Sequence, residues 1–214
     1  MAYEVRIYIN ANDNYFQPMR RKIFCCHHRP LVDRKNNILR IFEKHSLEVI
    51  FIEDFQFGVD LHTNDSKLNN AELSLMKKHL KILETIVAEN IEQAFIIEDD
   101  LFVEDGFDLS GFFDKIVEQK SEYDIIFFGS SDNMHVTDYV DEKVVYHVKP
   151  QSRCAHGYFV TKKCCEAILP SVHFNKPYDH FLNEMINDKN LLCGWTYPHL
   201  LQMTEMKILK STLR

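Results

Sequence analysis

The sequence predicts an α/β protein: a single domain with a mostly parallel central sheet flanked by helices. Two observations support this prediction. Short apolar runs alternate with amphipathic helical segments, and polar residues follow directly where each run stops. Strand, helix and strand in this order imply right-handed crossovers. In such sheets ligands bind beyond the carboxyl ends of the strands, so the polar residues there are the first candidates for a site.

Composition favours one domain that buries a substantial core. The chain has 214 residues, of which 45% are hydrophobic and 12% aromatic. A formal charge of -7 and a pI near 5.9 argue against broad binding to nucleic acid or an anionic membrane. The 6 cysteines lack CxxC pairs, so we expect mostly buried thiols. Without a signal-peptide pattern or an apolar run of about 18 residues, a cytoplasmic location is the expectation.

The first quarter of the chain predicts two strands of the sheet and the helix between them. Alternating polarity at 4–9 predicts an edge strand within an otherwise unassigned N-terminal extension, residues 1–20. A buried strand at 23–26, a helix at 33–45 capped by Asp33, and a strand at 49–52 follow.

The middle of the chain contains the longest predicted helix, residues 69–89. Its apolar residues recur three and four apart, and Glu72 and His79 share one of its faces. Asn90 is expected to end it. We then expect strands at 94–97 and 125–128, with a helix at 112–119 between them.

The last third is less regular. The expected elements are strands at 144–148 and 158–160, a helix at 162–169 that Pro170 ends, and a helix from Lys176 to about Asn187 with Asp179 in its first turn. Apolar residues recur with no strong period in residues 195–214.

Three consecutive acids, Glu98, Asp99 and Asp100, follow the apolar run at 94–97. Burial cannot continue through three unpaired carboxylates, so the acids must lie where the strand emerges. Side chains alternate along a strand, so Glu98 and Asp100 point the same way, as ligands of a divalent cation would. The alternative is a solvated turn. The sequences HHRP, EDF, EDD and GSSD follow four predicted strands, and their convergence on one edge favours a site.

Several common catalytic patterns are absent from the sequence. There is no GxxxxGK[ST] loop, GxGxxG turn, HExxH helix or GxSxG elbow. Their absence weighs against P-loop, dinucleotide-binding, zinc-protease and α/β-hydrolase functions. The kind of site that the sequence still supports is a metal site formed by carboxylates on an α/β sheet.

The order of the longer segments resembles glycosyltransferase family 25, the lipooligosaccharide and collagen galactosyltransferase group, over roughly residues 21–213. The most specific elements are Arg29, Asp33 and Arg34 after the first strand, Glu72 with His79, the acidic triplet, and Pro177 with Asp179. Two departures are visible. Lys78 precedes His79 where many members have Ser, and residues 53–57 fit the usual small-residue turn poorly. The segments are HHRPLVDRKNNILRIFEKHSLEVIFIEDF, NNAELSLMKKHLKILETI, AFIIEDDLFVEDGF, RCAHGYFVTKKCCEAIL, KPYDHFLNEMI and LKSTL.

The resemblance implies a GT-A-like nucleotide-sugar transferase. Such an enzyme moves a hexose, most simply from a UDP-sugar, to a hydroxyl of a glycan or protein, with inversion at the anomeric carbon. Glu98 and Asp100 would form a DxD-like motif that holds Mn²⁺ or Mg²⁺, and Asp179 would be the general base. Donor-binding candidates are Arg29, Arg34, Asp54, Glu72, His79, Asp99 and Arg153.

Several of these residues could instead have a purely structural role. Asp179 could simply complement a helix dipole, His79 could be a buried packing residue, and Arg34 could be solvated. For the whole chain, the alternatives are a catalytically inactive nucleotide-sugar or glycan-binding module of the same fold and a metal-dependent phosphate-ester enzyme. The second is disfavoured because no further acid cluster is spaced for a two-metal site.

Overall fold

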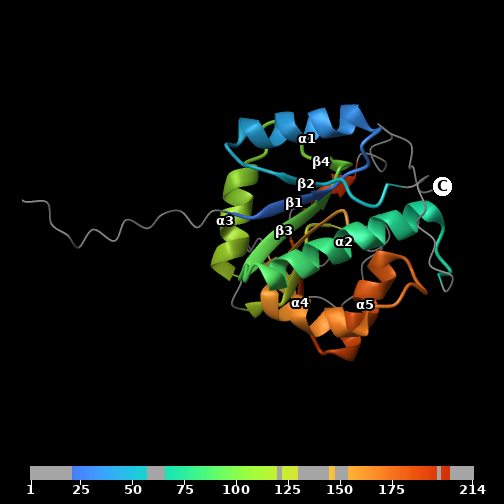
Figure 1. The fold of residues 1–214 in the computed structure, drawn as a ribbon. Helices are drawn as coiled ribbons and strands as arrows, with labels where there is room; N and C mark the ends of the chain where they lie inside the picture. Colours follow the sequence, from blue (N-terminus) through green and yellow to red (C-terminus); the bar gives the residue numbers. More distant parts are fainter. Residues whose placement is uncertain are drawn as a thin grey trace, which may run out of the picture.

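The computed structural model describes residues 21–56, 66–119, 122–129, 145–147, 154–196 and 199–202. These residues form a mixed α/β layer structure in which helices cover both faces of one sheet (Figure 1). The edge strand predicted at 4–9 and the candidate Arg153 lie outside the described residues.

The central sheet has seven strands in the order β2-β1-β3-β7-β5-β8-β6. Three neighbouring pairs are parallel and three are antiparallel, so the expectation of a mostly parallel sheet is not confirmed. The reason is that β7 inserts between β3 and β5 and runs against both, and that β6 runs against β8. The strands are β1 (Ile23–Cys26), β2 (Ile50–Ile52), β3 (Gln93–Glu98), β5 (Ile125–Phe127), β6 (Val145–His147), β7 (Gly157–Thr161) and β8 (Cys193–Thr196).

Two hydrophobic clusters fill the space between the sheet and its helices. Helices α2 (Asn70–Ala88), α4 (Lys162–Ile168) and α5 (Tyr178–Asp188) pack on one face, and α1 (Val32–Lys44) and α3 (Leu109–Gln119) on the other (Figure 1). Strand β3 serves both clusters because its side chains alternate: Ile96 belongs to the first and Phe95 to the second. The apolar run at 94–97 is therefore buried on both faces, as predicted.

Helix α2 confirms the prediction for the longest helix almost to the residue. Asn69 caps it, and Glu72 completes a capping box by accepting a hydrogen bond from the Asn69 backbone N–H at 3.0 Å. Asn90 follows the helix with a positive φ of 54°, which is consistent with its predicted role at the end.

Other boundaries differ from the predictions. Helix α1 has Leu31 at its N-cap, so Asp33 lies inside the first turn and does not cap it. Helix α3 begins three residues before Phe112, at Leu109. Two short strands, β4 (Leu101–Phe102) and β9 (Leu201–Gln202), were not predicted and form a separate antiparallel pair. Strands of two residues are too short to leave a periodic pattern.

The cysteines behave as expected, since all six are free and only Cys154 is partly exposed. In the part of the chain that the structure describes, no helix combines the length and apolar character needed to cross a bilayer.

Candidate functional site

The carboxyl ends of β1, β2 and β3 bring polar side chains together, as predicted for three of the four strand ends; residues 130–132 of the fourth, GSSD, lie outside the described residues. Parallel pairing aligns Cys26 of β1 with Ile52 and Glu98 of its neighbours, so the residues that follow meet at one edge. His27 lies between the two neighbouring strand ends. Its Nδ1 is 2.7 Å from Asp99 Oδ2, and its Nε2 is 3.9 Å from Glu53 Oε1.

Asp99 is the best-satisfied of the three acids. Its carboxylate accepts hydrogen bonds from His27 Nδ1 at 2.7 Å, Arg34 at 2.9 Å and the His28 backbone N–H at 3.3 Å. Burial by itself would raise the pKa of Asp99, but the bonds from His27 and Arg34 outweigh it and lower the pKa below the usual value. Asp99 therefore stays ionised and holds Arg34 and His27 in place.

Glu98 and Asp100 are in the opposite situation. Burial, followed by repulsion from Asp99 and Asp179, raises the pKa of Glu98 to about 8. Burial, followed by repulsion from Glu98, raises the pKa of Asp100 to about 7. Asp100 Oδ1 is buried without a hydrogen-bond partner among the described residues. The two side chains thus form a poorly compensated acidic pair, which a cation would stabilise.

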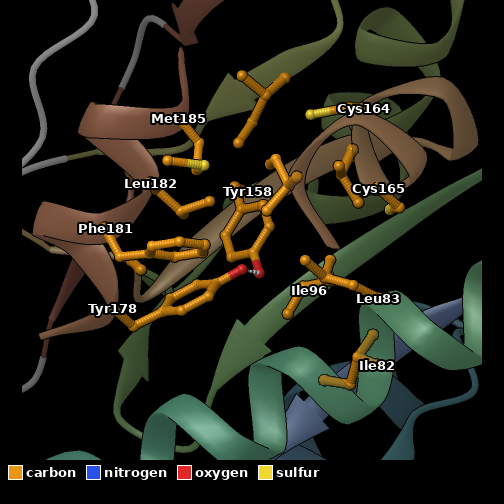
Figure 2. Packing of buried hydrophobic residues seen from close by; sticks show 14 of the residues in the cluster. Ile82, Leu83, Ile96, Tyr158, Cys164, Cys165, Tyr178, Phe181, Leu182 and Met185 are labelled. Atoms are coloured by element: carbon orange, nitrogen blue, oxygen red, sulfur yellow. Dashed lines mark hydrogen bonds between the residues drawn. The ribbon is translucent and has the colours of Figure 1, made fainter. Parts of the chain in front are cut away.

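Behind Glu98 lies a buried network of aromatic side chains. His79 Nδ1 is 3.0 Å from the Tyr158 hydroxyl, which is 2.8 Å from the Tyr178 hydroxyl. Figure 2 shows Tyr158 of β7 and Tyr178 of α5 pointing toward one another with this bond between them. The His79 and Tyr178 rings stack with centroids 4.0 Å apart and planes 6° apart.

His79 is neutral in this environment. Burial, with a smaller effect from the charge of Lys78, lowers the pKa of His79 to about 3. Its Nε2 lies 3.4 Å from Glu98 Oε1. The histidine is fully buried and packs against Tyr178, and its predicted contact with a donor stays a prediction.

Asp179 lies near Glu98 and follows Tyr178 in the sequence. It lies in the first turn of α5, close enough to Glu98 and His79 for its charge to raise the pKa of both. The helix N-cap is Pro177, which makes no side-chain cap. The structure therefore brings the general-base candidate to the metal-ligand candidates.

The remaining candidates lie in different places. Arg29 is exposed and 3.6 Å from Glu53, which puts it at the β2 side of the edge. Asp54 is exposed and attracts the buried Lys78. Glu72 is occupied in the α2 capping box, a local role that its spacing from His79 did not reveal.

Sequence reasoning missed two residues of this region. His27 was not among the predicted site residues, yet its Nδ1 is 2.7 Å from Asp99 and its Nε2 is 3.9 Å from Glu53. Lys78 is 3% exposed, and burial lowers its pKa. The signals available were the position of His27 directly after an apolar strand and of Lys78 directly before His79.

The donor set fits a divalent cation that is shared with a ligand. Within the described ranges no three His, Cys, Asp or Glu side chains form a complete protein metal site. Mg²⁺ and similar ions are commonly held by one or two carboxylates together with substrate phosphates. Glu98 and Asp100 supply such carboxylates, and the partnerless Asp100 Oδ1 is a suitable ligand atom.

Comparison with known proteins gives no family assignment. No family model matches the chain, and no curated protein matches it. Among solved structures, the A197 protein from STIV shares 12% identity at a TM-score of 0.46, covering 83% of this chain and 81% of that one. An apo UDP-glucose pyrophosphorylase shares 11% identity at a TM-score of 0.43, covering 85% of this chain and 74% of that one. Likenesses this weak assign neither a family nor an activity.

Proposed function

We propose that the protein is a metal-dependent glycosyltransferase of the family 25 type with a GT-A-like fold. It would transfer a hexose from a nucleotide-diphosphate sugar, most simply a UDP-sugar, to a hydroxyl of a glycan or protein. One observation carries the proposal: the largely buried, undercompensated pair Glu98 and Asp100 lies at the carboxyl edge of the sheet, with Asp179 near Glu98. The order of the family-like segments along the chain supports it.

Glu98 and Asp100 would hold Mn²⁺ or Mg²⁺. When bound, such an ion offsets the negative charge that grows on a departing diphosphate. Asp99 contributes indirectly, because it fixes Arg34 within 3.7 Å of Asp100 and keeps His27 between two strand ends. This arrangement keeps one side of the acidic pair rigid.

Asp179 would act as the general base. As the acceptor oxygen attacks the anomeric carbon, its proton passes to the Asp179 carboxylate, while the bond from that carbon to the diphosphate oxygen breaks. A direct displacement of this kind inverts the carbon and needs one positioned base. The start of α5 is held for this role by the stacking of Tyr178 on His79.

The proposal is tested with a panel of nucleotide sugars. We expect one of them to raise the melting temperature in the presence of Mn²⁺, since ligands that bind the folded state stabilise it by mass action. The same donor should then release its nucleoside diphosphate when a glycan or hydroxylated acceptor is added, and EDTA should abolish the release. Binding without turnover would identify the inactive binding module instead, and phosphate release regardless of the sugar would favour a phosphate-ester enzyme.

A further inference from the structure

Phe55 has an unusual backbone conformation at the carboxyl end of β2. Its φ is 54°, in the left-handed region that bulky residues rarely adopt. The other non-glycine residues with positive φ in the described ranges, Ser46, Asn90 and Asn190, each follow the end of a helix, where this conformation is common. No helix end explains Phe55.

The conformation is held from helix α2. The Ser74 hydroxyl donates a hydrogen bond to the Phe55 carbonyl, and Lys78 Nζ lies 3.4 Å from the same oxygen. Lys78 also donates to Ser74 Oγ at 2.6 Å. Both α2 side chains are buried, at 1% and 3% exposure. Two buried polar side chains thus hold one carbonyl group in place at the edge of the sheet.

This fixation does not serve to bury the Phe55 ring, which remains 38% exposed. Backbone outliers that the surroundings enforce cluster at ligand-binding sites, where they hold a contact group in place. Short distances connect the end of β2 to the acidic triplet. Phe55 lies two residues after Glu53, whose carboxylate is 3.9 Å from His27, and His27 is 2.7 Å from Asp99, the residue between Glu98 and Asp100.

We propose that the Phe55 ring is the platform on which the nucleobase of the donor stacks, with Ser74 and Lys78 as the positioning residues. This inference rests on the proposed function and adds a second contact region to it. The diphosphate end of the donor lies at Glu98 and Asp100, beyond β3, and the base end lies at Phe55, beyond β2. Stacking accepts any base, because every base has a π face, so Phe55 supplies affinity rather than choice of base.

The test compares UDP with pyrophosphate by calorimetry in Mn²⁺. Phe55→Leu should weaken UDP binding about tenfold, because it removes base stacking, and should leave pyrophosphate binding unchanged. Phe55→Tyr keeps the ring and should bind UDP like the wild type. Leu192→Ala is the control, because Leu192 is 49% exposed and lies just before β8, the second strand from the opposite edge of the sheet.

A second variant separates function from structure. Asn adopts positive φ more readily than Phe, so Phe55→Asn should raise the melting temperature while it weakens UDP binding. A structural role for the ring would lower the melting temperature instead. Ser74→Ala should also weaken UDP binding, but not in the Phe55→Leu background, where no platform remains to be positioned.

The outcomes distinguish this inference from the proposed function. If Phe55→Leu binds UDP as tightly as the wild type, or if the wild type binds UDP no better than pyrophosphate, the stacking platform is overturned and the metal site stands. If the wild type binds neither UDP nor ADP nor GDP, both proposals fall.

Discussion

At the scale of single residues, three neighbouring acids have different chemistry because of their partners. Hydrogen bonds from His27 and Arg34 lower the pKa of Asp99, whereas burial and repulsion from neighbouring acids raise the pKa values of Glu98 and Asp100. Asp99 is therefore a structural anchor, whereas Glu98 and Asp100 are the candidate metal ligands. The division yields three predictions.

The first concerns Asp100 as a metal ligand. Asp100→Asn keeps the shape of the side chain but removes its negative charge, so the enzyme should lose its response to Mn²⁺ and at least about 100-fold in kcat. Rates are measured across a Mn²⁺ titration. Asp105→Asn, an exposed acid five residues along, should change nothing. Unchanged rate and metal response in Asp100→Asn would exclude the metal assignment.

The second concerns stability and pH. A carboxyl whose pKa is raised in the folded state binds its proton more tightly there than in the unfolded chain. The stability that this provides is present at low pH and is lost as pH rises through about 7 for Asp100 and about 8 for Glu98. In EDTA, the melting temperature should therefore fall as the pH rises from about 5 to about 8 and change little above that.

Comparison with a variant isolates this pH effect. In Glu98→Gln/Asp100→Asn, the fall in melting temperature over the same range should be smaller, because neither side chain can ionise. Mn²⁺ should stabilise the wild type more at pH 8 than at pH 6, since it binds the deprotonated carboxylates. A wild type and double variant with parallel pH profiles would show that the acids are not buried as described.

The third concerns Asp179. As general base it should contribute on the order of 10² to 10⁴ to the rate, so Asp179→Asn should lower kcat by that factor while donor affinity stays nearly constant. Asp188→Asn, an exposed acid at the other end of α5, is the matched control. A loss below about tenfold would remove Asp179 from the mechanism.

At the scale of elements, the buried contacts among His79, Tyr158 and Tyr178 join α2, β7 and α5. Tyr178 begins α5, so its stacking on His79 fixes the turn that carries Asp179. Helix α2 has the clearest sequence pattern of the three elements, whereas β7 and α5 belong to the less regular last third of the chain. The contacts between these three elements could not be predicted from the sequence, because the periodicity of a segment shows only which of its own faces is apolar.

The network makes a prediction about Tyr178. Tyr178→Phe keeps the stacking and removes one hydrogen bond, so it should lower the free energy of unfolding by about 1 kcal/mol and leave kcat nearly unchanged. Tyr178→Leu also removes the flat ring against His79 and should lower kcat with little effect on donor affinity. Urea unfolding and steady-state kinetics measure the two effects. Equal kcat in both variants would mean that the stacking does not position α5.

At the scale of the whole molecule, the direction of β7 decides the architecture. The strand pairs antiparallel to β3 and β5, and the Glu98 backbone N–H donates to the His156 carbonyl just before it, at 2.8 Å. Five strands, β1, β2, β3, β5 and β8, still point the same way, so their carboxyl ends share one edge. The candidate site depends on this edge and not on a fully parallel sheet.

The sequence by itself determined the local features: the buried run that forms β3, the amphipathic helix α2 with Asn90 after its end, and the position of three acids where a strand stops. Hydrophobic periodicity acts over a few residues, so it can be recognised in the sequence. That Asp99 and Asp100 stay buried there was not predicted. Only the tertiary structure decided that Arg34 and His27 satisfy Asp99, that Asp179 lies beside Glu98, and that α2 pins the Phe55 carbonyl. Desolvation and Coulomb interactions depend on distances in space, and segments far apart in the chain set those distances.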